Sequence, residues 1–249
     1  MARNLLRNTE PNAMVTVPTV TEQSEKDLSF PKVVLHLHLD GSIRFSTLLE
    51  LSLPHGTPLK GAKTVEKLKK VTHESANLSK LLEAFDLFLP VVRGDKVAIE
   101  RIAYEMCDDQ AADGVVYFEG RYSPHLLCLP GGELTPKGIV EAKMIAEKRN
   151  SNSPGGMPVL VGHDWAVPLD WKDHPVATWA KDKVNFSISR DDPTCFDSTM
   201  LSELHLVQHE VGLSPHQLWQ CQLNAARSCI LPEKRPIVEK ILAAEPKSH

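Results

Sequence analysis

The chain has 249 residues, 42% hydrophobic and 24% charged, which is typical of a globular protein with one large domain or two small ones. Its 28 basic and 32 acidic residues give a net charge of −4. No broad positive field is therefore available to attract nucleic acid or anionic lipid, so these two partner classes are excluded as first interpretations.

Cysteine content and hydropathy indicate a cellular compartment. The five cysteines are odd in number and form no CxxC pair, which disfavours a disulfide framework and a thiolate zinc site. No run approaches the roughly 18 apolar residues of a membrane helix, and residues 1–30 lack the apolar segment of a secretory signal. We therefore expect a cytoplasmic protein without membrane insertion.

The first thirty residues differ in composition from the rest. Residues 1–30 mix Thr, Glu, Asn, Pro and Val without periodicity, which predicts a disordered N-terminal leader. We expect order, and a single domain, over residues 31–249. Residues 32–39 form an apolar run, β-branched at its start and closed by Asp40 and Gly41, which predicts a short buried parallel strand.

Beyond this strand, apolar residues recur at helical spacing, interrupted by short β-branched runs. Thr135 before Pro136 and Ser214 before Pro215 mark helix starts. Strands separated by helices imply a parallel α/β architecture, in which function collects at the carboxyl ends of the strands. In chain order, we expect a helix over 45–53, two helices within 78–112 separated at Pro90 and Gly94, a strand over 114–118, a helix over 135–148, a loop over 150–156, strands over 158–161 and 184–189, and helices over 197–210, 214–230 and 235–244.

His36 and His38 stand two residues apart at the end of the first expected strand. Because side chains alternate along a strand, both imidazoles point to one side and can hold a zinc ion at about 2.0–2.1 Å. Histidines in this pattern also occur at core and turn positions. The pattern alone leaves a metal site and a structural role open.

Asp191 and Asp192 follow the strand expected over residues 184–189 and precede Pro193. Neighbouring carboxylates leave a strand in opposite directions, so one can bind a cation while the other faces a ligand. Adjacent acids are also common as solvated turn residues. Both interpretations stand on these residues taken alone.

Four segments resemble adenosine deaminases. Residues 31–42 (PKVVLHLHLDGS) are similar to the opening strand of that family, and residues 187–193 (SISRDDP) are similar to its last strand. Residues 101–127 resemble the second strand with its preceding helix, and residues 224–228 (NAARS) resemble a C-terminal helix. The matches follow the family order along the chain, which makes chance a poor explanation.

The resemblance implies a (β/α)8 TIM-type barrel with one catalytic zinc ion at the carboxyl ends of its strands. His36 and His38 match the metal ligands of the first strand, and Asp191 matches the ligand of the last strand. First and last strands adjoin when a barrel closes, so the resemblance explains how ligands from the two ends of the chain can share one ion.

The implied reaction is hydrolytic deamination of adenosine and deoxyadenosine in purine metabolism, with zinc-assisted attack of water at C6 and loss of ammonia. The implied substrate contacts are Asp40 to the ribose 5′ hydroxyl and Asp192 to N7, with His38 also beside the substrate. The apolar helix that gates the pocket in this family matches a set of side chains that is equally typical of a core-facing helix stripe, namely Leu78, Leu81, Leu82 and Phe85.

The sequence also departs from the family. The third histidine ligand, the proton-donating glutamate and the oxyanion-orienting histidine come from blocks resembling HAGE and GHG, and neither block occurs here. Only about sixty residues separate Tyr122 from Val184, room for at most two βα units of roughly thirty residues each where the family has five. We therefore expect an incomplete barrel, internally truncated around residues 128–172, and assign no catalytic acid. His163 has flanks unlike the missing ligand block, so we interpret it as a turn residue.

Two further positions differ from the family pattern. Gly120 stands where an apolar residue is expected, and Arg190 stands where a small polar residue is expected. A positive charge beside the metal-binding Asp191 is expected to weaken cation binding.

Three interpretations of activity remain. The chain is a deaminase with impaired hydrolysis, a truncated or spliced product acting at most as a binding or regulatory module, or another amidohydrolase such as an AMP deaminase or a deaminase-like growth factor. The negative net charge and the lack of a basic phosphate-binding cluster disfavour a nucleotide substrate. The lack of a signal sequence disfavours the secreted factor.

Overall fold

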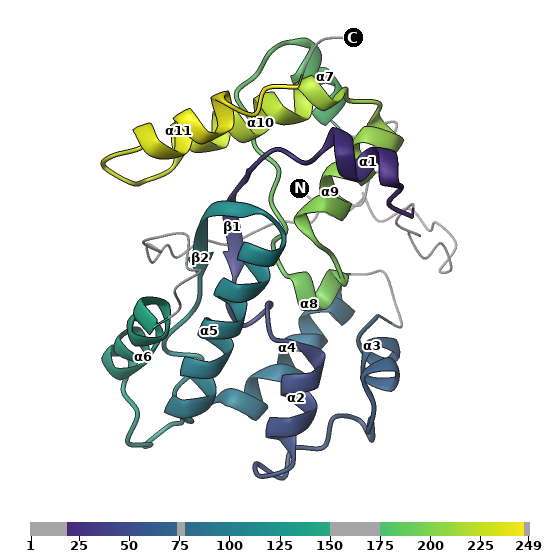
Figure 1. Cartoon of the computed structure of the whole chain (residues 1–249). Helices are drawn as coiled ribbons and strands as arrows, with labels where there is room; N and C mark the ends of the chain where they lie inside the picture. Colours follow the sequence, from purple (N-terminus) through teal and green to yellow (C-terminus); the bar gives the residue numbers. More distant parts are fainter. Residues whose placement is uncertain (1–18, 74–77, 150–174, 247–249) are drawn as a thin grey trace, which may run out of the picture.

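The structure is a computed structural model that describes residues 19–73, 78–149 and 175–246, with the backbone alone for residues 73, 78–82 and 143–149. The described part is α/β (Figure 1). Its elements in chain order are α1 (Glu22–Asp27), β1 (Lys32–His38), α2 (Phe45–Ser52), α3 (Val65–His73), α4 (Leu78–Val92), α5 (Lys96–Ala112), β2 (Val115–Arg121), α6 (Pro136–Arg149), α7 (Val176–Lys181), α8 (Pro193–Phe196), α9 (Met200–Leu206), a π-helical turn (Val207–Val211), α10 (Pro215–Ser228) and α11 (Arg235–Leu242).

Strands β1 and β2 are parallel neighbours in the middle of the molecule, joined through helices α2 to α5 (Figure 1). Their register places Leu37 opposite Gly120 and His38 opposite Arg121. On the other side of β1, Leu37 forms an isolated parallel bridge with Asp191. Strand β1 therefore lies between β2 and the segment that carries Asp191, as the first strand of a closed barrel lies between the second and the last.

Helices cover both ends of this short sheet (Figure 1). Helices α2, α3, α4 and α8 lie toward the carboxyl end of β1, and α10 with α11 lie toward its start. At that start the Val33 amide donates to Oε1 of the fully buried Gln222 at 2.7 Å, which fixes α10 against β1. The Trp219 indole then donates to the Ile241 carbonyl at 2.8 Å and fixes α11 against α10.

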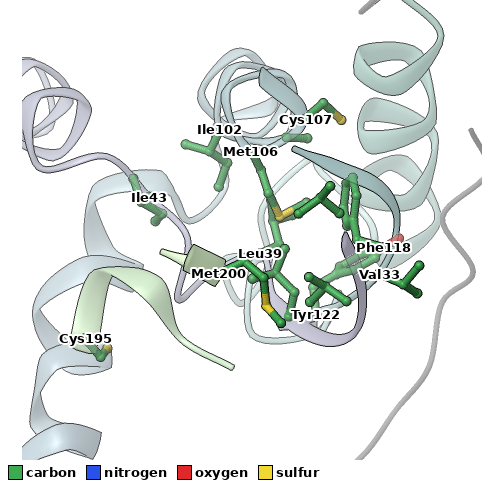
Figure 2. Close-up of a cluster of buried hydrophobic side chains, with 14 of the residues drawn as sticks. Val33, Leu39, Ile43, Ile102, Met106, Cys107, Phe118, Tyr122, Cys195 and Met200 are labelled. Atoms are coloured by element: carbon green, nitrogen blue, oxygen red, sulfur yellow. The ribbon is translucent and has the colours of Figure 1, made fainter. Parts of the chain in front are cut away.

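The core gathers apolar residues from β1, β2 and the helices that pack on them (Figure 2). Val33 and Leu39 flank the strand at its two ends, Phe118 comes from β2, and Ile102 and Met106 come from one face of α5. Because α5 contributes buried residues at helical spacing, it presents a continuous stripe to the sheet. The core thus supports the strand that ends in the two histidines.

Most expected elements are confirmed within one to three residues. They include β1, β2 and the helices α2, α6, α10 and α11. Ser214 caps α10 by accepting from the Gln217 amide at 3.2 Å, with Pro215 in the first turn. Pro90 does not separate two helices as expected, because α4 continues past it to Val92. The break lies at Gly94, whose φ of 78° suits a residue without Cβ.

Order begins earlier than residue 31. The expected leader contains α1, whose N-cap Thr21 accepts from the Ser24 amide at 3.1 Å. Leu28 and Phe30 are 0% and 3% exposed and belong to the core. The prediction of disorder is wrong for residues 22–30, because two apolar side chains after a capped turn are enough to hold this segment; residues 1–18 lie outside the described ranges.

The strand expected over residues 184–189 is absent from the described structure. Val184 and Phe186 alternate as in a strand, yet this segment makes no ladder and reaches β1 only through Leu37 and Asp191. The helix expected over residues 197–210 is shorter, because Asp197 is left-handed and the capping box at Thr199 starts α9 at Met200. An apolar pattern within one segment does not show whether a neighbouring strand is available to form hydrogen bonds with it.

Three further helices, α3, α7 and the short α8, were not expected. The loop over residues 150–156, the strand over residues 158–161 and His163 fall outside the described ranges. No helix in the part of the chain that the structure describes is long and apolar enough to cross a membrane.

Candidate metal centre

Three potential metal ligands meet at the carboxyl end of β1. His36 Nε2 and His38 Nε2 lie 3.0 Å apart, and Asp191 Oδ1 lies 3.3 Å from the first and 3.4 Å from the second. Each of the three residues is partly exposed. The structure thus brings together the three residues that the sequence singled out, and their binding of a metal ion stays a prediction.

The spacing fits a single zinc ion. Ligands about 2.0–2.1 Å from a tetrahedral zinc are separated from one another by roughly 3.3 Å, close to the three observed separations. Asp191 Oδ1 is buried and has no hydrogen-bond partner among the described residues, although it faces two imidazole nitrogens. Two nitrogen donors and an unsatisfied carboxylate oxygen are a donor set that suits zinc.

Backbone hydrogen bonds hold Asp191 beside β1. The His38 amide donates to the Asp191 carbonyl at 2.9 Å, and the Asp191 amide donates to the His36 carbonyl at 3.3 Å. Asp191 has a φ of 55°, in the left-handed region that few residues other than glycine adopt. Aspartate tolerates this region better than most side chains, and strained residues concentrate at functional sites.

Asp40 and Asp192 lie buried beside the ligands. Burial raises the pKa of the Asp40 carboxyl, and the neighbouring His38 opposes that shift. Asp40 Oδ1 lies 4.0 Å from His38 Nδ1, on the ring edge opposite the nitrogen that faces Asp191. Asp192 approaches the loop after β1 so closely that a Cβ on Gly41 would lie 1.8 Å from Asp192 Oδ1. Glycine at position 41 is what lets this carboxylate reach the site.

The expected pocket gate is described only in part. Helix α4 contains all four residues, and it packs on α2 and α3 near the carboxyl end of β1. Phe85 is half-buried against the core. The structure describes only the backbone of Leu78, Leu81 and Leu82. The role of these residues in a gate therefore stays a prediction.

Two residues that follow the aspartates were not singled out from the sequence. The Thr194 hydroxyl donates to the Ile43 carbonyl at 2.7 Å, and the Thr194 amide donates to the Gly41 carbonyl at 2.8 Å. Cys195 is buried, and this burial together with Asp192 and Asp40 raises the pKa of its thiol. The sequence signal that could have identified Thr194 is its position as a polar residue directly after Pro193, at the start of a helix.

The Arg190 side chain contacts groups of α5 and of the segment before α9. Its guanidinium is buried with Nη1 3.4 Å from Asp113 Oδ2, so an acidic group of opposite charge accompanies it. Burial lowers the pKa of Arg190, and Asp113 opposes that shift. The expectation that this charge weakens cation binding stays a prediction, and the pairing with Asp113 opposes it. Gly120, the other unusual position, is buried in β2 opposite Leu37.

Within the described residues, His36, His38 and Asp191 are the one group of three His, Cys, Asp or Glu side chains close enough to hold a metal ion. A family model for adenosine deaminase matches residues 31–156 and 166–244 of the chain. The adenosine deaminase of Danio rerio is 28% identical over 338 residues, covering 85% of this chain and 93% of that protein. The adenosine deaminase of Xenopus tropicalis is 39% identical over 347 residues, covering 88% and 97%.

Solved structures agree on the fold. Arabidopsis ADAL complexed with IMP has a TM-score of 0.70 at 17% identity, covering 89% of this chain and 99% of that one. An amidohydrolase from Burkholderia ambifaria with bound Zn has a TM-score of 0.63 at 15% identity, covering 94% and 97%. At these identities the likeness shows the fold of the TIM-barrel amidohydrolases. With the family model spanning most of its length, the chain belongs to the adenosine deaminase family, whose members are hydrolases acting on C–N bonds.

Proposed function

We propose that the chain binds one zinc ion through His36, His38 and Asp191, and a purine nucleoside beside it through Asp40 and Asp192. The observation that carries this proposal is the convergence of two Nε2 atoms and a buried, unsatisfied Asp191 Oδ1 within 3.4 Å of one another. Three protein ligands leave a coordination position open, as in catalytic rather than structural zinc sites.

The reaction class that fits this site is hydrolytic deamination of adenosine or deoxyadenosine. Zinc in such a site supplies activation of water near neutral pH. His38 lies between Asp191 and Asp40 and orients one ring edge toward each carboxylate. Asp40, with its raised pKa, and Asp192 present carboxyl oxygens for hydroxyl and ring-nitrogen contacts of a nucleoside. The Cys195 thiol, protonated because of its burial, stays out of the chemistry.

We further propose that the barrel is incomplete and that hydrolysis is slow. The HAGE and GHG blocks that supply the general acid, a third histidine ligand and an oxyanion-orienting histidine do not occur in the sequence. The alignment with the Danio rerio enzyme spans 338 residues, but this chain has only 249. This difference supports the proposal that some segments of the relative have no counterpart in this chain. Loss of a general acid costs roughly 10²–10⁴ in rate.

Metal content tests the zinc site. We expect the purified full chain to retain about one zinc per molecule, and Asp191→Asn to bind zinc at least 100-fold more weakly, because even outer-sphere changes cost about 10–100-fold. Asp197→Asn is a matched control, since Asp197 is also left-handed with a φ of 50° but is exposed and paired with Lys69 at 2.7 Å. Equal zinc affinity in both variants would contradict the assignment of Asp191.

A ligand panel tests the substrate. We expect calorimetric titrations with adenosine, deoxyadenosine and AMP to show tighter binding of the two nucleosides than of the nucleotide. The ADAL structures carry IMP and GMP, so AMP is the decisive alternative. Loss of adenosine absorbance measured in the same samples gives the hydrolysis rate. Turnover at the rate of an ordinary enzyme would overturn the proposed impairment, and preference for AMP would overturn the nucleoside assignment.

A further inference from the structure

A buried arginine directly precedes the candidate ligand Asp191. Arg190 is 7% exposed, and its guanidinium contacts three groups on other elements. Nη1 lies 3.4 Å from Gln110 Oε1 and 3.4 Å from Asp113 Oδ2, both near the end of α5. Nη2 donates to the Ser198 carbonyl, just before α9. The planar guanidinium fork thus spans two helices that approach from different parts of the chain.

Asp113 connects the same two helices from the other side. It is the C-cap residue of α5, and its carboxylate accepts from the Met200 and Leu201 amides in the first turn of α9. The start of α9 carries partial positive charge, so an acidic side chain is stabilised there. Arg190 therefore binds to a junction that is already fixed by Asp113.

Two backbone hydrogen bonds hold Asp191 to β1, from the His38 amide to its carbonyl at 2.9 Å and from its own amide to the His36 carbonyl at 3.3 Å. Its left-handed backbone is nevertheless costly for a residue with a side chain. No strand ladder supports it, since its bridge to Leu37 is isolated. The direction of the Asp191 carboxylate depends on backbone torsions that a shift at residue 190 would change.

We propose that Arg190 is a positioning residue for the metal ligand Asp191. Its guanidinium anchors residue 190 in the α5–α9 junction, which keeps the next residue left-handed and aims Asp191 Oδ1 at His36 and His38. The inference rests on the proposed zinc site and adds a part to it. The positive charge at this position has an acidic partner, because Asp113 Oδ2 lies 3.4 Å from Arg190 Nη1.

Zinc affinity of the full chain, measured by competition with a chromophoric chelator, tests the inference. Arg190→Met is expected to weaken zinc binding at least tenfold. Arg190→Lys keeps the charge but not the fork, so it is expected to weaken binding as well, by a smaller factor. In cobalt-substituted protein both variants should show altered visible absorption, because the ligand geometry changes.

Arg44→Met is the matched control. Arg44 also binds α5, through Asp109 one turn before Asp113, with Nη2 2.7 Å from Asp109 Oδ1, but it does not adjoin a candidate ligand. Arg44→Met should lower the melting temperature and leave zinc affinity within twofold of the unsubstituted chain. If Arg190→Met does not fold, Arg190→Lys carries the same comparison.

The outcomes separate the two proposals. An unsubstituted chain that binds no zinc overturns the zinc site and this inference with it. Zinc bound normally by the unsubstituted chain and equally tightly by the Arg190 variants overturns the positioning role alone. An equal loss of affinity in Arg44→Met also overturns it, because the effect would then be general destabilisation.

Discussion

Gly41 and Asp192 are in such close contact that one methyl group tests the site. A Cβ at position 41 would lie 1.8 Å from Asp192 Oδ1 and 2.8 Å from Asp192 Cβ, so the whole side chain has to move. We expect Gly41→Ala to lower the free energy of unfolding by about 1–3 kcal/mol, as for other overpacked sites. Adenosine affinity should fall at least tenfold. Urea denaturation and calorimetry measure the two effects.

Gly131→Ala provides the comparison for Gly41→Ala. Nothing lies within 4 Å of a Cβ at Gly131, but its φ is 72°, so this substitution carries backbone strain without a clash. It is expected to cost about 1 kcal/mol and to leave adenosine binding unchanged. Unchanged adenosine affinity in Gly41→Ala would contradict the role of Asp192.

At the residue scale, the sequence predicted which candidate ligands lie close together. It predicted less well which neighbouring side chains hold them in place. The alternation of a strand places His36 and His38 on one side, and the proximity of Asp191 follows from the family resemblance. The direction of the Arg190 side chain was beyond such reasoning. It depends on Asp113 and Ser198, which only the packed helices α5 and α9 bring to it.

Helix α10 is held to β1 by one buried side chain. Gln222 is 0% exposed and accepts from the Val33 amide at 2.7 Å, across 189 residues of sequence. We expect Gln222→Leu to lower the free energy of unfolding by about 1–3 kcal/mol, because a buried amide is left without an acceptor. Chemical denaturation measures the loss, and hydrogen exchange at Val33 should accelerate.

Gln220→Leu on the same helix is the control for Gln222→Leu. Gln220 makes only a local contact, donating to Asn224 Oδ1 at 3.0 Å. Its replacement should change the unfolding free energy by less than about 0.5 kcal/mol. Comparable losses in the two variants would show that α10 tolerates no apolar substitution here and that the Val33 contact is not the cause.

At the element scale, strong local signals succeeded and partner-dependent ones failed. The N-cap and proline at Ser214 and Pro215 placed α10 closely, because capping is encoded within a few residues. The apolar alternation from Val184 to Ile188 predicted a strand that lacks a ladder in the described structure, because a strand also needs a neighbour. Helix α3 has apolar residues at Val65, Leu68 and Val71, a spacing that was available in the sequence and not used.

Across the whole molecule, the order of neighbours follows the plan of a barrel. Strand β1 pairs with β2 on one side and reaches Asp191 on the other. A local pattern cannot specify how many βα units lie between β2 and that segment, since closure depends on the summed width of all strands. The resemblance supplied the ends of the barrel, and the proposal of a missing middle rests on residue counts and absent blocks.

Bound zinc would connect the beginning and the end of this fold, since His36 and His38 lie on β1 and Asp191 lies more than 150 residues later. A ligand that binds only the folded state stabilises it by about 2.7 kcal/mol when its free concentration is 100 times the dissociation constant. For a chain of this size we therefore expect zinc to raise the melting temperature by roughly 5–10 °C relative to chelator-treated protein.

The same zinc titration on Asp191→Asn shows whether the effect belongs to the site. Any zinc bound by the five cysteines of the unfolded chain reduces the stabilisation, and we expect this reduction to be equal in both variants. Only the difference between the unsubstituted chain and Asp191→Asn reports on the folded site, and differential scanning calorimetry measures it. The purified chain could bind zinc and still have the same melting temperature before and after a chelator removes the ion. That result would mean that zinc does not stabilise the contact between Asp191 and β1.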